Sequence, residues 1–326
     1  MITRRKLLIS SAAAAAAASM AGRAFAAAPP LPKKDTYKVG FAQTESNNPW
    51  RLAQTKSMQD EAAKRGWQLV YTDAAGSAAK QVADVNSMIA QQVDLIFLAP
   101  REEVPLIPAI MAAKAANIPV ILLDRNVDQS LAKPGEDYVC FIGSNFIEEG
   151  QRIAEYLVNM NGDKKTIIEL EGTVGSSPAN DRKKGFDEYL AKHEGYQIVA
   201  SQSGDFARDK GRQVAETLLQ AHPEANVIYA HNDEMAIGAI AALEAAGRKA
   251  GREDCLVFSI DGGREAVQLV VDGKIEAVVE CNPRFGPKAF DTAVAYANGE
   301  QIPPVIINPD QIYTPENAAK LLDTAY

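Results

Sequence analysis

Four short apolar runs in this chain end in the same way, on a charged or amide side chain. The runs cover residues 120–123, 227–230, 256–260 and 277–279, and the polar side chains that follow them include Asp124, Asn232, Asp261 and Glu280. A short run rich in β-branched residues is typical of a strand that is buried on both faces of a parallel sheet. Ligands of open α/β sheets bind just outside the carboxyl ends of such strands. The pattern therefore predicts a parallel α/β sheet with a binding site at its strand ends.

Strand-like and helix-like segments alternate along most of the chain, with short connections between them. Such alternation implies right-handed crossovers and a parallel sheet. The rhythm breaks at residues 129–137 and then starts again, which predicts two successive doubly wound units of similar size. We expect strands at residues 39–43, 69–73, 95–100, 120–124, 139–144, 166–171, 197–203, 227–230, 256–260 and 277–280, and helices at 49–65, 78–91, 106–116, 148–159, 182–192, 211–220, 234–246, 264–271 and 287–298. The expected fold class is α/β, with two parallel-sheet lobes that face a ligand across a cleft.

The first residues indicate where the protein works. Residues 1–26 carry a basic start with the pair Arg4 and Arg5, an Ala-rich apolar stretch and a small-x-small site ending at Ala26, which together predict an export signal peptide. The paired arginines favour the twin-arginine route, with an ordinary secretory leader as the alternative. We expect cleavage near Ala26, a periplasmic mature protein and an extended Pro-rich linker at residues 27–36.

Charge and cysteine usage narrow the choice of partners. The formal net charge is −8, which argues against nucleic acid or an anionic membrane surface as the partner. The three cysteines are widely spaced and show no Cys-x-x-Cys pattern, so a disulfide framework is not indicated. We expect Cys140 and Cys255 in the core and Cys281 near the site, and a single Cys140–Cys281 bridge stays open.

Motifs for catalysis, cofactors and metals are missing from the sequence. It contains no Gly-x-Gly-x-x-Gly fingerprint after a strand, no phosphate-binding loop, no Gly-x-Ser-x-Gly and no His-Glu-x-x-His. Asp124, Asp261 and Glu280 could flank a glycosidic bond, but Arg125 beside Asp124 favours ionised carboxylates over proton transfer. We therefore expect a binding protein without enzyme activity, cofactor or metal. An exported sugar-modifying enzyme stays as an alternative.

The residue types at the predicted strand ends suit a sugar. Asp, Glu, Asn and Arg engage two adjacent hydroxyls at once, and the C–H face of a sugar ring packs on an aromatic side chain. Trp50, after the first strand, and Phe206, after a later one, supply such surfaces. The structural alternatives are local packing for the two aromatic residues, a surface ion pair for Asp124 and Arg125, and helix caps for Asn232 and Asp261.

An ordered set of motifs carries a family resemblance. It comprises Leu-Leu-Asp-Arg at 122–125, Glu-Leu-Glu-Gly-Thr-Val-Gly-Ser-Ser at 169–177, Asp-Arg-Lys-Lys-Gly-Phe at 181–186, Ser-Gln-Ser-Gly-Asp-Phe at 201–206, Tyr-Ala-His-Asn-Asp-Glu-Met at 229–235 and Ser-Ile-Asp-Gly at 259–262. From about Tyr37 to its end, the chain resembles the type I periplasmic sugar-binding proteins of ABC importers, in the ribose/galactose cluster. Within that cluster it is most similar to the galactofuranose-binding type.

The resemblance assigns ligand contacts position by position. An arginine follows the tryptophan at Trp50-Arg51, as in the galactofuranose type, whereas Asn47-Asn48-Pro49 resembles the loop of ribose binders. The exact sugar therefore stays open. The binding residues that the resemblance implies are Asn48, Trp50, Arg51, Asp124, Arg125, Arg182, Phe206, Asn232, Asp261 and Glu280.

The resemblance also implies a role. We expect a monomer that captures a monosaccharide, galactofuranose or a related furanose or hexose, and delivers it to a membrane permease powered by a separate ATPase. The N-terminal lobe would comprise residues 37–143 and 283–308, and the C-terminal lobe residues 144–282 and 309–326, with crossovers near Ser144, Asn282 and Pro309. A sugar sensor for chemotaxis or signalling, and a binder of ribose-like pentoses or polyols, are the alternatives.

Overall fold

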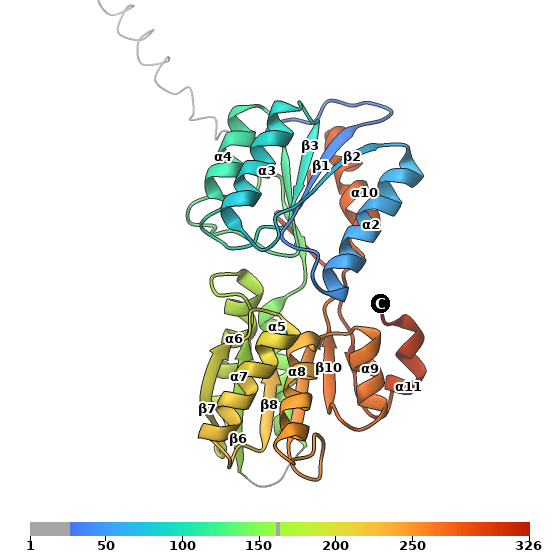
Figure 1. Ribbon diagram of the computed structural model, residues 1–326. Helices are drawn as coiled ribbons and strands as arrows, with labels where there is room; N and C mark the ends of the chain where they lie inside the picture. Colours follow the sequence, from blue (N-terminus) through green and yellow to red (C-terminus); the bar gives the residue numbers. More distant parts are fainter. Residues whose placement is uncertain (1–26, 161–163) are drawn as a thin grey trace, which may run out of the picture.

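The computed structural model describes residues 27–160 and 164–326, which form two lobes arranged end to end (Figure 1). Each lobe is built on a six-stranded sheet with helices on both faces. The predicted fold class is confirmed. The leader expected at residues 1–26 lies outside the described residues. Within the described ranges, no helix combines the length and the apolar character that crossing a bilayer requires.

The N-terminal lobe contains β1 (Lys38–Gln43), α2 (Pro49–Arg65), β2 (Gln68–Asp73), α3 (Ala78–Ala90), β3 (Leu95–Leu98), α4 (Ile107–Ala115), β4 (Val120–Leu123), β5 (Phe141–Gly143), α10 (Gly286–Ala297) and β11 (Val305–Ile307). Its sheet has the order β11-β5-β4-β3-β1-β2, with every pair parallel. Helices α3 and α4 cover one face, and α2 and α10 cover the other (Figure 1). The central strands β3 and β4 are buried along their whole length, as their continuous apolar runs predict.

The C-terminal lobe contains α5 (Phe146–Asn159), β6 (Lys165–Glu171), α6 (Ser177–Leu190), β7 (Tyr196–Ser203), α7 (Arg208–Ala221), β8 (Val227–Ala230), α8 (Asp233–Ala245), β9 (Leu256–Asp261), α9 (Arg264–Val271), β10 (Ala277–Glu280), β12 (Ile312–Tyr313) and α11 (Ala318–Leu321). Its sheet has the order β12-β10-β9-β8-β6-β7, and only β12 runs antiparallel to its neighbour. Helices α5 and α6 pack together on one face, and α7 and α8 on the other.

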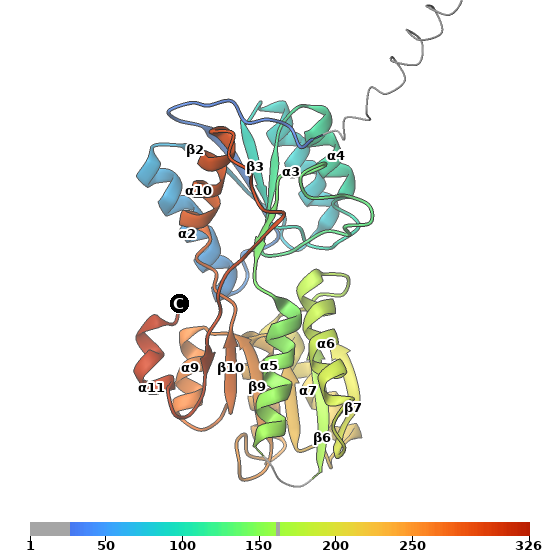
Figure 2. The same cartoon turned by 180° about the vertical axis from the view of Figure 1, so that it is seen from behind.

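The chain passes between the lobes in three connections, β5 to α5, β10 to α10 and β11 to β12. Figure 2 shows the first and the third of these crossing the gap. The connections contact one another, because the Asn282 N–H donates to the Asp310 carboxylate at 3.2 Å and the Ser144 hydroxyl lies 3.6 Å from Cys281 Sγ. Three adjacent connections that contact one another are typical of a hinge about which two lobes rotate.

Local sequence signals fix the helix starts that face the cleft. Asn48 caps α2, with Oδ1 accepting from the Arg51 N–H at 2.9 Å, and Pro49 occupies the first turn. Gly66, with φ 66°, ends this helix in the left-handed conformation that glycine adopts readily. Asn232 caps α8 in the same way, accepting from the Met235 N–H at 3.0 Å.

Some elements differ from the sequence-based expectation. Helix α6 begins at Ser177, five residues before the predicted start at residue 182. The strands β11 and β12 and the helix α11 were not expected, because two to four residues show no periodicity. The Pro-rich segment at 27–36 packs on the N-terminal lobe rather than lying free, since Ala28 and Leu31 are buried and the Tyr296 hydroxyl donates to the Ala28 and Pro29 carbonyls. All three cysteines are free and buried, so the Cys140–Cys281 bridge is not formed.

Candidate ligand-binding cleft

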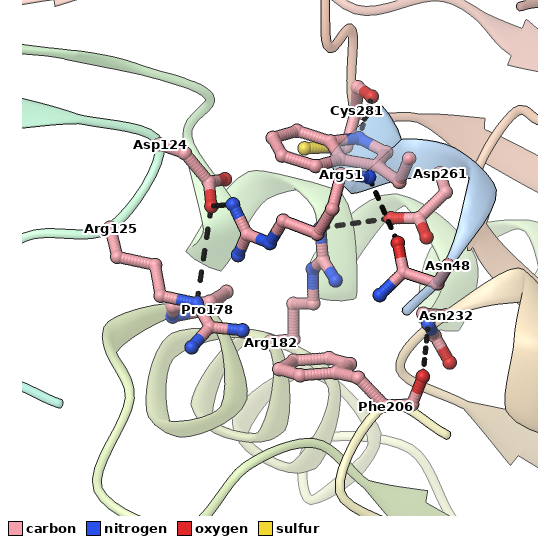
Figure 3. Close-up of a pocket in the computed structure, with 11 residues that line it drawn as sticks. Asn48, Arg51, Asp124, Arg125, Pro178, Arg182, Phe206, Asn232, Asp261 and Cys281 are labelled. Atoms are coloured by element: carbon pink, nitrogen blue, oxygen red, sulfur yellow. Dashed lines mark hydrogen bonds and ion pairs between the residues drawn. The ribbon is translucent and has the colours of Figure 1, made fainter. Parts of the chain in front are cut away.

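A buried cavity lies between the lobes, where the carboxyl ends of the two sheets face each other. Figure 3 shows side chains from both lobes converging on it. The lining residues are Asn48, Trp50, Arg51, Asp124, Arg125, Pro178, Arg182, Phe206, Asn232, Asp261 and Cys281. Every one of them is buried, so the two lobes together shield the cavity from bulk water. Every predicted binding residue except Glu280 lies in this lining.

The N-terminal lobe contributes a buried ion pair. Arg51, in the first turn of α2, places Nη1 2.7 Å from Oδ2 of Asp124, which follows β4. The same Nη1 donates to Gln54 Oε1 at 3.0 Å, and the guanidinium lies 4.6 Å from the centre of the Trp50 ring. Trp50 is anchored in turn, because its Nε1–H donates to the Cys281 carbonyl at 2.7 Å. The guanidinium of the pair is therefore held in place by Gln54 and by the anchored ring of Trp50.

Arg125 is the most deeply buried cation of the cavity, with 1% of its surface exposed. Its Nη1 donates to the Arg101 carbonyl at 2.9 Å, and its Nη2 lies 3.7 Å from Glu45 Oε1. Burial and the nearby charge of Arg51 lower the pKa of Arg125 to about 9, so the guanidinium stays charged at neutral pH. Its Nε has no hydrogen-bond partner among the described residues. A buried donor without a partner carries a desolvation cost that a ligand oxygen can relieve.

The C-terminal lobe contributes Arg182, from α6. Its Nε donates to Glu149 at 2.7 Å, its Nη1 donates to the His231 carbonyl at 2.6 Å, and its Nη2 lies 3.6 Å from Asp261 Oδ1. Burial, reinforced by the charge of Asp233, raises the pKa of Asp261 well above its usual range, and Arg182 opposes this shift. Arg182 thus favours the ionised form of Asp261, against the effect of burial.

Phe206 supplies the aromatic surface of the C-terminal lobe. It adopts a left-handed backbone with φ 57°, and its carbonyl accepts from Asn232 Nδ2 at 3.1 Å. The ring packs on Gly172, where an added Cβ would lie only 1.9 Å from ring atom Cζ. The guanidinium groups of Arg125 and Arg182 lie 5.4 and 5.9 Å from the ring centre. The ring is therefore fixed at the floor of the cavity with two cations beside it.

Two features of the lining differ from the sequence-based expectation, whereas the prediction that Cys281 lies near the site is confirmed. Glu280 is not part of it; the carboxylate accepts from the Gln311 N–H at 3.2 Å on the hinge side. Cys281 lines the cavity instead, because adjacent side chains of an extended segment point in opposite directions. Pro178 was not expected, and the early start of α6 at Ser177 places it there. The capping interpretation holds for Asn232, which also lines the cavity, whereas Gly263 rather than Asp261 caps α9.

The lobes touch directly along one rim of the cleft. The Glu103 N–H donates to the Gly175 carbonyl at 2.9 Å, and Asn180 Nδ2 donates to Glu103 at 3.0 Å. Arg101 of the N-terminal lobe lies 3.3 Å from Asp205 of the C-terminal lobe. These contacts join surfaces that only meet when the cleft is shut, so the structure represents the closed arrangement.

The chemistry of the lining is that of hydrogen bonding to a polar ligand. Guanidinium donors lie beside carboxylate acceptors in the lining, and the described residues contain no group of His, Cys, Asp and Glu that could hold a metal ion. Such neighbouring donors and acceptors match the paired donor and acceptor character of adjacent hydroxyls. Fold and cavity together define a two-lobe binding protein whose ligand is enclosed at a hinged cleft.

Comparison with known proteins identifies the family. Residues 39–301 match the model of the periplasmic binding protein domain. The chain is 39% identical over 290 residues to the galactofuranose-binding protein YtfQ of Escherichia coli, covering 87% of this chain and 90% of that protein. It therefore belongs to the periplasmic binding protein family, and the resemblance drawn from its motifs is confirmed.

Solved structures support the same assignment. The crystal structure of a galactofuranose binding protein superimposes with a TM-score of 0.85 at 38% identity, covering 89% of this chain and 98% of that chain. The periplasmic component of the arabinose ABC transporter from Shewanella sp. ANA-3, bound to α- and β-L-arabinofuranose, gives a TM-score of 0.82 at 37% identity, covering 88% and 95%.

Proposed function

We propose that this protein is the solute-binding component of an ABC sugar importer and that it captures a monosaccharide in its furanose form, galactofuranose or a close relative. The observation that carries the proposal is the arrangement of two ion pairs from opposite lobes, Arg51–Asp124 and Arg182–Asp261, around one buried cavity. A ligand that bonds to both pairs favours the closed lobes over the open ones.

The balance of charge favours a neutral ligand. Each of the three guanidinium groups in the lining lies beside a carboxylate, Arg51 beside Asp124, Arg125 beside Glu45 and Arg182 beside Glu149. A charged ligand would leave one buried charge without compensation, which is costly. Sugar hydroxyls satisfy both the donors and the acceptors without adding charge, and Phe206 offers a surface for the ring.

The relatives favour a five-membered sugar ring. One relative is named for galactofuranose, and one structural neighbour holds arabinofuranose. We therefore propose that Asn48, Trp50, Arg51, Asp124, Arg125, Arg182, Phe206, Asn232 and Asp261 contact the sugar. A pentofuranose such as arabinose or ribose is the second candidate, favoured by the ribose-type loop Asn47-Asn48-Pro49.

The rest of the role follows from membership of the family and from the leader. We propose a periplasmic monomer without enzyme activity whose lobes close about the connections near Ser144, Asn282 and Pro309, and whose closed form docks on a membrane permease. The hinge contacts between Ser144, Cys281, Asn282 and Asp310 support this position of the rotation axis.

A ligand screen tests the proposal. The mature chain is heated with D-galactose, L-arabinose, D-ribose, D-fructose and polyols, and hits are measured by isothermal titration calorimetry. A large rise in Tm with a sugar that forms furanoses, and 1:1 binding, is the expected result. Product analysis after prolonged incubation tests the absence of enzyme activity. If no sugar raises the Tm, the proposed ligand class is wrong. If a sugar is converted to a product, the protein is an enzyme and the binding-only function is wrong.

A further inference from the structure

The backbones of helices α5 and α6 are in contact at the point where the two helices cross, beside the cavity. An added Cβ on Gly150 would lie 2.1 Å from the Arg182 carbonyl oxygen, and one on Gly185 would lie 2.0 Å from the Ile147 carbonyl oxygen. No side chain fits at either position, so the two glycines set how closely the helices approach. This close crossing brings Glu149, the neighbour of Gly150, level with Arg182.

Glu149 completes the environment of Arg182 without lining the cavity. Its side chain is 2% exposed, and its Oε2 accepts from Arg182 Nε at 2.7 Å. The guanidinium is thereby held at three nitrogens, by Glu149, the His231 carbonyl and Asp261. Because the guanidinium is planar and is held at these three points, the orientation of its remaining N–H groups is fixed.

Glu149 also borders the hinge. It lies in the first turn of α5, which begins at Phe146 directly after the first interlobe connection. It also helps to line a second hollow together with Asn308, Pro309 and Asp310 of the third connection. One residue therefore pairs with the binding-site arginine and borders a hollow that the hinge lines. Its second oxygen, Oε1, is buried without a hydrogen-bond partner among the described residues.

We propose that Glu149 is a positioning residue for ligand binding, which holds the Arg182 guanidinium in its binding orientation and ties it to the hinge end of α5. The inference rests on the proposed sugar-binding function. Glu149 does not line the cavity, and the lining residue to which it is hydrogen-bonded is Arg182.

The shifted pKa of Glu149 predicts a pH dependence of binding that tests the proposal. Burial raises the pKa of its carboxyl above the usual glutamate range, and the positive charge of Arg182 opposes this shift. The ionised form, which pairs with Arg182, therefore declines on acidification at a higher pH than for an ordinary glutamate. The titratable or charged groups around it are Arg182, Asp124, Asp261, Tyr229, Cys281, Asp310, Glu148 and Arg152.

Two substitutions at this site separate positioning from simple structural damage. Glu149→Ala removes the partner of Arg182, and Glu149→Gln keeps the shape and an accepting oxygen but not the charge. The matched control is Glu148→Gln, because Glu148 is the exposed neighbour on the same turn and bonds only to Asn145 in the structure. The probe is the sugar with the largest thermal shift in the ligand screen, titrated calorimetrically between pH 5 and 8.

The expected result is a loss of affinity of about tenfold or more for Glu149→Ala, since truncating one partner of a buried charge pair has effects of this size. Glu149→Gln should bind more weakly than the wild type at pH 8 and show a flatter pH profile. The control should match the wild type throughout. Equal affinities for Glu149→Ala and the control, or a wild-type pH profile in Glu149→Gln, would overturn the proposal.

A measurement without sugar keeps this test independent of the proposed function. The Arg182 Nε–H is recorded by ¹⁵N–¹H NMR in the ligand-free protein and assigned by its absence in Arg182→Lys. Slow exchange with water in the wild type and fast exchange in Glu149→Ala are expected. If no sugar binds but this difference appears, the proposed ligand is wrong while Glu149 does hold Arg182. If exchange is equally fast in both proteins, Glu149 does not hold the guanidinium.

Discussion

Arg51 and Asp124 form a buried ion pair, with Nη1 2.7 Å from Oδ2 and each side chain only 5% exposed. The two residues come from separate elements, the first turn of α2 and the end of β4. Both also line the cavity, and Arg125 Nε lies 3.9 Å from the same carboxylate oxygen. One aspartate thus compensates two cations that face the ligand.

Replacing this aspartate should disable binding. In Asp124→Asn the charge is lost while the size is kept, so Arg51 loses its carboxylate partner beside the ligand and Arg125 keeps Glu45 alone. We expect affinity for the sugar to fall at least about 30-fold, because breaking a buried charge pair costs about 2–5 kcal/mol. Asp60→Asn on α2, which removes an exposed pair with Lys56, is the control. Calorimetry that finds the same affinity in both variants would contradict the assigned role.

The importance of the position of the Phe206 ring can be tested by a substitution at Gly172, on which the ring packs. In Gly172→Ala the added Cβ would meet the ring 1.9 Å from Cζ, so the ring must move. We expect affinity to fall several-fold with little further loss in the double variant Gly172→Ala/Phe206→Ala compared with Phe206→Ala alone. A double-mutant cycle measures this coupling. Additive losses would show that the ring position does not matter for binding.

The rim contact between Arg101 and Asp205 should affect release more than capture. Asp205 has φ 57°, which asparagine tolerates, so Asp205→Asn removes the charge without straining the backbone. The pair is partly exposed, and such pairs contribute about 0.2–1 kcal/mol. We expect sugar dissociation to be roughly 1.5 to 5 times faster, with association unchanged, in stopped-flow fluorescence. A slower association with unchanged dissociation would argue against a contact that forms on closure.

The hinge should make stability depend on pH. Burial, reinforced by the charge of Glu149, raises the pKa of Asp310 to about 7, from an unfolded value of about 3.9. The folded state therefore loses stability as the pH rises from about 4 to 7, because the buried carboxyl must ionise. Asp310→Asn should raise the Tm by several degrees at pH 8 and leave it unchanged at pH 4. Asp323→Asn, at a side chain 94% exposed, is the control; a shift at pH 4 as large as at pH 8 would contradict this account.

The strand-end residues were predictable from the sequence because a strand that is buried along its whole length appears as a continuous apolar run. The apolar run of β4 predicts both the strand and the placement of Asp124 and Arg125 at its carboxyl end. Two asparagines proved to serve a double purpose. Asn48 and Asn232 cap helices and also line the cavity, so Asn232→Ala should cost about 1 kcal/mol of stability as well as affinity.

Other parts of the site depend on contacts that no local pattern carries. Which of Glu280 and Cys281 faces the cavity is decided by how the chain leaves β10 for the hinge. Glu149 reaches Arg182 only because Gly150 and Gly185 allow two helices to touch. Arg101 meets Asp205 only when the lobes are closed. The partners of the last two pairs are far apart in the sequence, and each residue alone looks like an ordinary surface charge.

The most direct test is calorimetric titration of the mature protein with a furanose-forming sugar, alongside the Asp124→Asn variant. The account predicts saturable 1:1 binding of D-galactose or L-arabinose by the wild type and at least about 30-fold weaker binding by the variant. Undiminished binding by the variant would show that the sugar occupies another site, and no binding of any furanose-forming sugar by the wild type would contradict the proposed function itself.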